Sequence, residues 1–183
     1  MKVVSTFSPS SSVLSSIKCR LIANSELEFL AVGKLDRLDV YSLQPEGLKL
    51  ECGLQIWGRV TAIKTIPVDV SSEFHLSGTY VLKESSWMQD PSGYDNLVVL
   101  TDHPDPELIF LSYTTLHTEG KDVAELKTLH HLSLYERNAR PAEFFNGMLL
   151  DPRGVVLVVS CYAGKLKVVL LEGGGYENDF DVS

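Results

Sequence analysis

The sequence predicts an all-β fold made of β-propeller blades, about three in number. Short apolar runs are separated by turns rich in Gly, Pro and Asp, and almost none shows the i, i+3, i+4, i+7 spacing of an amphipathic helix. Three hairpin cores, each with an inner apolar strand followed by a second strand, recur at intervals of about 60 residues: 29–41, 97–110 and 155–171. Ordinary propeller repeats have roughly 40 to 50 residues, so insertions in loops would explain the excess.

The N-terminal third reads as an arm followed by five strands. Residues 1–12 are rich in Ser and are expected to form the arm, and alternating or apolar patterns then predict five strands. Gly58 marks the turn between the last two of these strands. The predicted strands are 13–22, 28–33, 37–43, 48–57 and 60–68.

The middle of the chain contains a long polar insertion and one ambiguous segment. Residues 71–95 are rich in Ser, Gly and charge, which predicts a long loop. Strands are expected at 96–101 and 107–115. Residues 122–134 have apolar side chains at a spacing of three that could be helical, but Thr128, His130 and Ser133 are poor helix formers and favour a strand.

The C-terminal third predicts a tight succession of strands and turns. An apolar run at 148–150 ends at Asp151 and Pro152, because Pro cannot donate to a strand ladder, and Gly154 completes the turn. Residues 155–161 are apolar almost throughout, as in a buried inner strand, and Gly164 turns the chain into a strand at 165–171. Residues 172–183 are Gly-rich and then acidic, which predicts a disordered tail.

The number of predicted strands limits how many blades the chain can form. Eleven or twelve strands at four per blade make about three blades, whereas closed propellers typically have four to eight. We therefore expect residues 13–171 to form part of an incomplete first propeller, as in a truncated or excised product. The strand at 165–171 would then leave an unpaired apolar edge that favours self-association.

Composition and charge exclude several classes of function. The 183 residues carry a formal net charge of −8, which disfavours binding to nucleic acid or anionic lipid. No apolar segment is long enough to span a membrane as a helix. The three cysteines lack the spacing of a metal site and fit a reducing, intracellular compartment: Cys19, Cys52 and Cys161.

No residue pattern predicts catalytic, metal-binding or cofactor-binding chemistry. The run from Asp102 to Asp105 contains metal-ligand types, but a solvated turn explains it better. Cys161 lies in an apolar strand without a cationic neighbour, which predicts an inert thiol. Trp57 is expected in the core at a strand junction. Trp87, in the polar loop, is the one candidate anchor for a protein partner, although local packing within the loop would explain it equally well.

Two blocks of residues resemble a known family. The first contains the run 37–41, the triplet 46–48 and the aromatic-Gly-basic triplet at 57–59. The second contains Arg140-Pro141 with Glu143, Asp151-Pro152, Tyr162, Gly164, Lys167-Val168 and Leu171. At these spacings the sequence resembles the first propeller of the large subunit of the damaged-DNA-binding complex, the triple-propeller adaptor of cullin ubiquitin ligases.

The resemblance implies a non-catalytic scaffold that links propeller-type substrate receptors to a cullin ligase in DNA repair. It is expected in the nucleus, with the cytoplasm as a second location. The resemblance also implies little intrinsic DNA binding, a first propeller that forms one jaw of the receptor-binding cleft, and a cullin contact in a second propeller that this sequence does not contain. An alternative is the related propeller subunit of the cleavage and polyadenylation factor or of splicing factor 3b. A propeller-scaffold enzyme, with polar residues around a central channel, is the least favoured reading.

Overall fold

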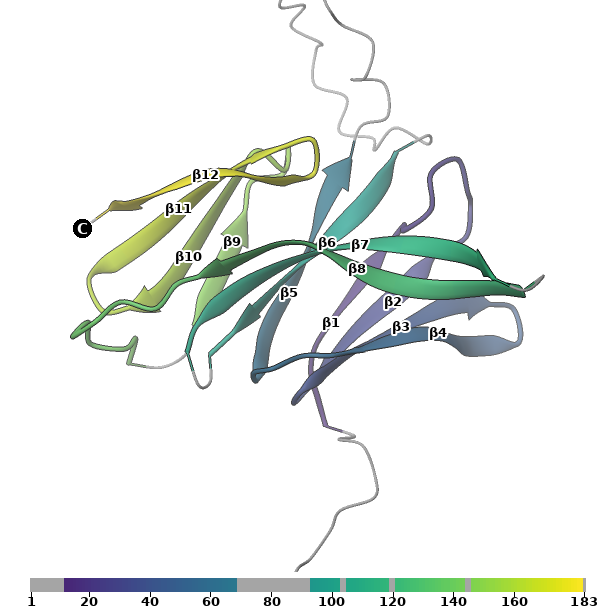
Figure 1. Ribbon diagram of the computed structural model, residues 1–183, viewed down its shortest axis with the longest axis horizontal. Helices are drawn as coiled ribbons and strands as arrows, with labels where there is room; N and C mark the ends of the chain where they lie inside the picture. Colours follow the sequence, from purple (N-terminus) through teal and green to yellow (C-terminus); the bar gives the residue numbers. More distant parts are fainter. Residues whose placement is uncertain (1–11, 69–92, 103–104, 119–120, 144–145, 183) are drawn as a thin grey trace, which may run out of the picture.

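The computed structural model describes residues 12–68, 93–102, 105–118, 121–143 and 146–182. Within these ranges the chain forms twelve strands and no helix, arranged as three four-stranded antiparallel sheets (Figure 1). The first sheet contains β1 (Val13–Cys19), β2 (Phe29–Lys34), β3 (Arg37–Gln44) and β4 (Gly47–Gln55). The second contains β5 (Val60–Val68), β6 (Tyr94–Thr101), β7 (Glu107–Thr118) and β8 (Lys121–Ser133), and the third β9 (Gly147–Leu150), β10 (Val156–Tyr162), β11 (Lys165–Glu172) and β12 (Gly175–Val182). The predicted all-β fold of about three blades is confirmed.

Each blade is a meander in which strands that follow one another in sequence are neighbours in the sheet. The three recurring hairpin cores of the sequence are β2–β3, β6–β7 and β10–β11, the two middle strands of each blade. The first strand of each core is predicted to be the inner strand of its blade, and this is wrong, because β1, β5 and β9 precede β2, β6 and β10 in the sheets. β9 has only four residues, so its signal in the sequence is weak.

The predicted disorder of the C-terminal tail is also wrong, because residues 175–182 form β12 along the edge of β11. The strand is acidic, and a lysine on β11 pairs with two of its three acidic residues. Lys167 Nζ lies 3.0 Å from Asp179 Oδ2 and 2.7 Å from Asp181 Oδ1. The edge strand of the third blade is therefore β12 rather than β11. The predicted arm and the long loop fall largely on residues 1–11 and 69–92, outside the described residues.

The ambiguous segment is a strand, β8, and a bulge explains its unusual spacing. Phe110 pairs with His130 and Leu111 with Thr128, so Leu129 is an extra residue in the ladder. A bulge of one residue moves the side chains that follow it to the opposite face of the sheet. Leu126 consequently packs toward the first blade and Leu132 toward the third.

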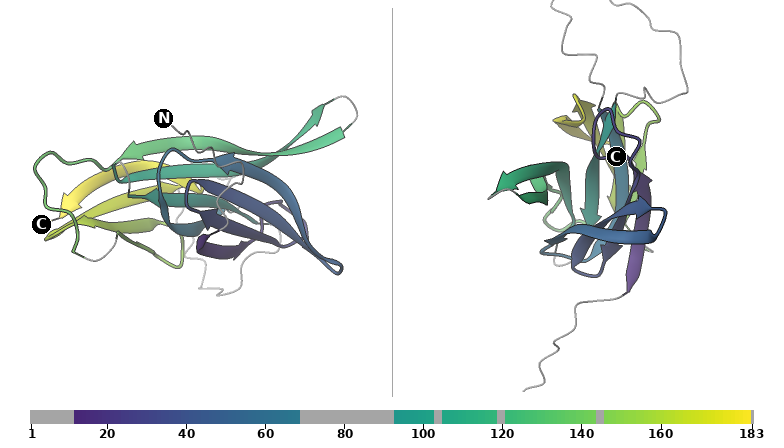
Figure 2. Two further views of the ribbon diagram at one scale, coloured as in Figure 1. Left: turned by 90° about the horizontal axis from the view of Figure 1, so that it is seen from below. Right: turned by 90° about the vertical axis from the view of Figure 1, so that its right-hand side faces the viewer.

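Two apolar cores join the three blades. The first lies between blades one and two and the second between blades two and three. β6 supplies both, because its alternate residues point to opposite faces: Leu97 and Val99 enter the first core, and Val98 and Leu100 enter the second. All four are fully buried, and each buried side chain of this size stabilises the fold by about 1.5 to 3 kcal/mol. Viewed from below, the blades lie side by side along the long axis of the molecule (Figure 2).

Two glycines allow neighbouring blades to approach closely. A Cβ at Gly33 on β2 would lie 2.7 Å from Val60 Cγ1 on β5, so only a hydrogen fits there. Gly174, in the turn before β12, has a φ of +77° and would place a Cβ against Val68 of the second blade. Its carbonyl accepts a 2.8 Å hydrogen bond from Asn96 Nδ2. The β11–β12 turn is therefore fixed to the second blade.

The outer faces of the first and third blades differ in chemistry. On the first blade Asp39, 1% exposed, binds Lys34 Nζ at 2.7 Å and Arg37 Nη2 at 2.6 Å. Burial alone would raise the pKa of Asp39, but the hydrogen bonds from Lys34 and Arg37 outweigh it and the pKa lies below its ordinary value. On the third blade the outer face carries a cross-strand row of apolar side chains: Leu149, Val158, Val168 and Phe180. Leu149 is 73% exposed.

Replacing Gly174 by Ala should destabilise the protein more than replacing its neighbour Gly173. Both residues have positive φ, which costs a residue with a Cβ about 1 to 2 kcal/mol. A methyl group at Gly173 meets open space, whereas one at Gly174 collides with Val68. We expect a loss of about 1 kcal/mol for Gly173→Ala and about 2 to 4 kcal/mol for Gly174→Ala in urea unfolding. Equal losses in the two variants would show that the turn does not pack on the second blade.

Asp39 should make folding stability depend on pH. Because its folded pKa is depressed below the ordinary 3.8, its contribution is present above that value and is lost as the pH falls through the folded pKa. In Asp39→Asn the two cations keep their burial and lose their anion. The difference in unfolding free energy between the two proteins should be largest at about pH 6 and shrink toward about pH 3. A difference that is constant over this range would contradict the assignment.

Candidate interaction site

The linker between the first two blades carries an aromatic side chain in solvent. Trp57 lies between β4 and β5 and is 91% exposed, so its predicted place in the core is wrong. The preceding residue, Ile56, occupies the core instead and donates its backbone N–H to the carbonyl of Asp36 at 2.8 Å. Ile56 is fixed inward, and the chain then bends at residues 57 and 58, which leaves the side chain of Trp57 in solvent.

The linker between the second and third blades repeats this arrangement. Leu134 is buried in the second core and donates its N–H to the carbonyl of Pro106 at 2.9 Å. Asp36 and Pro106 occupy equivalent positions, in the turns that join the two middle strands of successive blades. The residue after Leu134 is Tyr135, which is 59% exposed. Sequence reasoning missed this repeat, although a polar–aliphatic–aromatic triplet begins at the last residue of the fourth strand in both blades.

An open groove lies beside each aromatic. The Trp57 groove has a volume of about 1080 Å³ and the Tyr135 groove about 430 Å³. Arg59 lines both, so the two grooves adjoin. We call their combined surface the linker face.

The Trp57 groove is lined by Leu35, Asp36, Leu54, Gln55, Ile56, Trp57, Gly58, Arg59, Glu107, Ile109, Thr128 and His131. The Tyr135 groove is lined by Arg59, Asp102, Asp105, Pro106, Tyr135, Glu136, Asn138, Ala139, Pro141, Ala142, Asn146, Cys161 and Tyr162.

Ion pairs hold the linker face in shape. Arg59 binds Asp102 with two parallel hydrogen bonds, Nε to Oδ1 at 2.8 Å and Nη2 to Oδ2 at 2.6 Å. The hydrogen bond to Asp102 raises the pKa of Arg59. Within the Trp57 groove, His131 Nε2 lies 3.0 Å from Glu107 Oε2. The bidentate contact with Asp102 restrains the guanidinium of Arg59, which helps to fix the wall between the two grooves.

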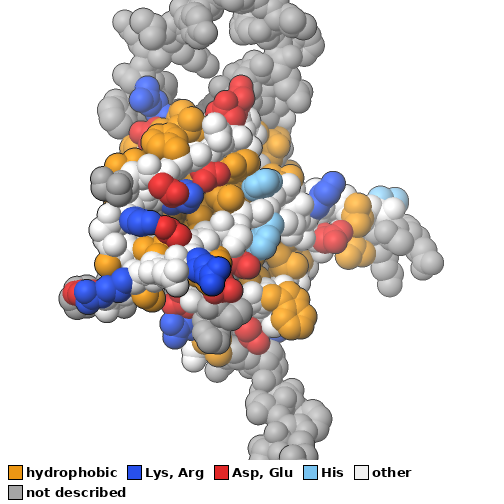
Figure 3. Space-filling view, turned by 60° about the vertical axis from the view of Figure 1, so that its left-hand side comes forward, with side chains coloured by type: hydrophobic (Ala, Val, Ile, Leu, Met, Phe, Trp, Pro, Cys, Tyr) orange, Lys and Arg blue, Asp and Glu red, His pale blue; other side chains and the backbone are white. Residues whose placement is uncertain are grey.

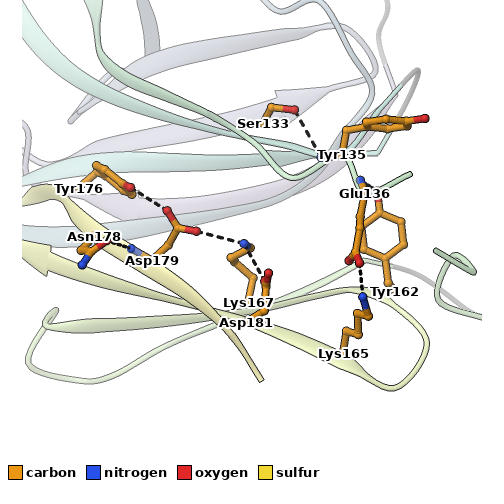
Figure 4. Close-up of polar contacts among 10 residues, drawn as sticks. All are labelled: Ser133, Tyr135, Glu136, Tyr162, Lys165, Lys167, Tyr176, Asn178, Asp179 and Asp181. Atoms are coloured by element: carbon orange, nitrogen blue, oxygen red, sulfur yellow. Dashed lines mark hydrogen bonds and ion pairs between the residues drawn. The ribbon is translucent and has the colours of Figure 1, made fainter. Parts of the chain in front are cut away.

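A second polar network joins the third blade to the second without forming a groove of this size (Figure 4). Tyr176 donates its hydroxyl to Asp179 at 2.7 Å, and Tyr176 and Lys167 hold the pKa of Asp179 below its ordinary value. The Tyr176 ring stacks on His130 of β8 at 4.1 Å between centroids. Nearby, Lys165 pairs with Glu136. These contacts attach β11 and β12 to the second blade and give the network a structural role.

The cysteines are unsuited to nucleophilic chemistry. Burial raises the pKa of the Cys19 and Cys161 thiols to about 12 and that of Cys52 to about 11. A thiol with such a pKa is almost wholly protonated at neutral pH, and the thiolate is the reactive form. Among the described residues, no three His, Cys, Asp or Glu side chains are grouped to hold a metal ion. His103 and Pro104 of the Asp102–Asp105 run lie outside the described residues.

The predicted site residues do not gather at one place. Trp87, the candidate partner anchor, lies outside the described residues. Gly58 lines the Trp57 groove. The other predicted turn residues lie between strands of the third blade: Asp151, Pro152, Gly154 and Gly164. Gly154 and Gly164 have φ values of +69° and +73°, and Gly154 donates its N–H to the Asp151 carbonyl at 2.8 Å.

Charges of both signs are interleaved on the face shown in Figure 3. On the side shown in Figure 3, lysine and arginine side chains lie next to acidic ones and form no continuous basic patch. No helix long and apolar enough to cross a membrane occurs among the described residues.

Comparison with known proteins identifies the family. A family model described as the RSE1/DDB1/CPSF1 first beta-propeller matches residues 12–179, a range that runs from the start of β1 into β12. No curated protein sequence matches the chain significantly. Because the family model covers nearly the whole chain and all three blades, the chain belongs to the RSE1/DDB1/CPSF1 first beta-propeller family.

Proposed function

We propose that the chain is a non-catalytic scaffold that binds protein partners through the linker face. The observation that carries this proposal is Trp57, which is 91% exposed beside a groove of about 1080 Å³. Tryptophan is enriched among the residues that dominate protein–protein binding energy. Such a residue contributes most when the partner removes its side chain from water. The backbone of its linker is fixed by hydrogen bonds to Asp36 and Leu35, so the side chain is presented from a rigid support.

The cysteines and two of the histidines have structural roles, which supports the proposal that the chain is not catalytic. The three cysteines have raised pKa values. His131 pairs with Glu107, and His130 stacks on Tyr176. These groups stabilise contacts between strands and blades, whereas a catalytic site needs a base and a nucleophile directed at one reacting atom.

We propose further that the scaffold is part of a nuclear adaptor that links propeller-type substrate receptors to a cullin ubiquitin ligase in DNA repair. Support comes from the resemblance to the large subunit of the damaged-DNA-binding complex. Of the blocks that carry this resemblance, Trp57-Gly58-Arg59 lines an exposed groove, where a partner could contact it. In that family the cullin contact belongs to a second propeller, so the chain itself is proposed to bind receptors.

The partners that contact the chain in cells should identify its pathway. We expect crosslinking of the tagged chain, followed by mass spectrometry, to recover propeller-type substrate receptors and ligase components from the nuclear fraction. Recovery of cleavage, polyadenylation or splicing factors in their place would favour the RNA-processing alternative. If nothing is enriched over an unrelated tagged protein, the chain is not a scaffold.

The chain should bind duplex DNA only weakly. Its net charge of −8 repels the phosphate backbone, so electrostatic attraction cannot supply affinity. In fluorescence anisotropy we expect binding no tighter than the roughly 10⁻⁴ to 10⁻⁶ M of non-specific complexes at physiological salt. Nanomolar binding that is lost steeply on adding salt would contradict this expectation.

A further inference from the structure

We infer that the linker face binds a basic, apolar protein segment, one that places an aliphatic or aromatic side chain in the Trp57 groove and directs neighbouring Lys or Arg residues toward the carboxylates around it. The inference rests on the proposed scaffold function and specifies the chemistry of the partner. It does not depend on which pathway the partner belongs to.

The Trp57 groove supplies the apolar part of this site. Leu35, Leu54 and Ile109 line it together with Trp57, and Leu35 is itself exposed. Its volume, about 1080 Å³, lies just above the range of about 300 to 1,000 Å³ for sites that bury drug-sized ligands. The groove can therefore accept a bulky apolar side chain of a partner and part of its backbone.

The charged part of this site is an excess of carboxylates around the two grooves. Five acidic residues line the two grooves: Asp36, Glu107, Asp102, Asp105 and Glu136. Arg59 is the one lysine or arginine among the lining residues, and Asp102 already binds it. Glu107 and Glu136 also have partners, His131 and Lys165. Asp36 and Asp105 form no ion pair with any other described residue. A cationic segment would complement this surface, and a phosphate backbone would be repelled.

The two exposed aromatics add a second feature that favours cations. The face of a Trp or Tyr ring attracts the guanidinium of Arg or the ammonium of Lys when the cation lies within about 6 Å of its centre. Trp57 and Tyr135 occupy equivalent positions on consecutive linkers, and Arg59 joins their grooves. A single segment that crosses the wall between the grooves can thus contact both rings.

The outer face of the third blade is a weaker candidate for this role. Its apolar row from Leu149 to Phe180 is exposed, but nothing in its chemistry specifies an occupant. The linker face, in contrast, combines an apolar groove with more acidic than basic side chains. It therefore predicts both the shape and the charge of what binds.

The test uses short random peptides displayed on phage and selected on the folded chain. We expect enriched peptides to contain Lys or Arg next to Leu, Phe or Trp. The best peptide is then titrated into the chain and four variants: Trp57→Ala, Tyr135→Ala, the double variant Asp36→Asn with Asp105→Asn, and Leu116→Ala. Leu116 is the control, because it is 49% exposed on β7 and lines neither groove.

Trp57→Ala should weaken binding about tenfold or more, and Tyr135→Ala less, since truncating a central aromatic removes most of its contact area. The double Asn variant should weaken binding about threefold or more and reduce its dependence on salt. Leu116→Ala should change nothing. Because Trp57 and Tyr135 are exposed, thermal unfolding should be unaltered and loss of binding cannot be attributed to misfolding. Failure to enrich peptides, enrichment of acidic peptides, or full binding to Trp57→Ala would each overturn the inference.

Crosslinking of Trp57→Ala in cells separates this inference from the proposed function. If receptors still crosslink at wild-type levels, the scaffold function stands and the linker face is not its binding site. If basic peptides bind as expected but no receptor is recovered from cells, the site stands and the adaptor function does not.

Discussion

Stacking of one sheet face on the next is the physical constraint on which this structure depends. A four-stranded meander makes local contacts within the sheet, but it buries apolar area only against another sheet. The second blade satisfies this constraint on both faces, since alternate residues of β6 enter different cores. The bulge at Leu129 allows β8 to do the same, because it redirects the side chains that follow toward the third blade.

The same constraint places the exposed aromatics. Each linker must supply a buried aliphatic residue to the core between two blades and must pair its backbone with the preceding hairpin turn. Ile56 and Leu134 meet both requirements, so the residue that follows each one is left in solvent. Trp57 and Tyr135 are therefore presented by the packing of the blades rather than by a separate loop. Their equivalence follows from the geometry of the repeat, even though the two linkers have different lengths.

Sequence reasoning could predict the strands because their residue patterns reflect local pairing and burial. It could not predict β12, since Asp179 and Asp181 look like a solvated tail until the register brings Lys167 beside them. It misplaced Trp57 for a related reason: hydrophobicity favours burial of Trp, whereas the hydrogen bond from Ile56 to Asp36 decides which neighbour points inward. Trp87 was chosen because it lies in a polar loop, and that criterion says nothing about a groove formed by two blades.

The two outer faces of the three-blade arc are chemically unequal, and this limits how copies of the chain can associate. A head-to-tail stack would press the apolar row at Leu149 and Phe180 against the first blade, where Asp39 is held by Lys34 and Arg37. Covering those two partly exposed cations with apolar side chains would remove their remaining water without supplying new anions, which is unfavourable. The ion pairs of the first blade therefore disfavour open-ended stacking of the arc.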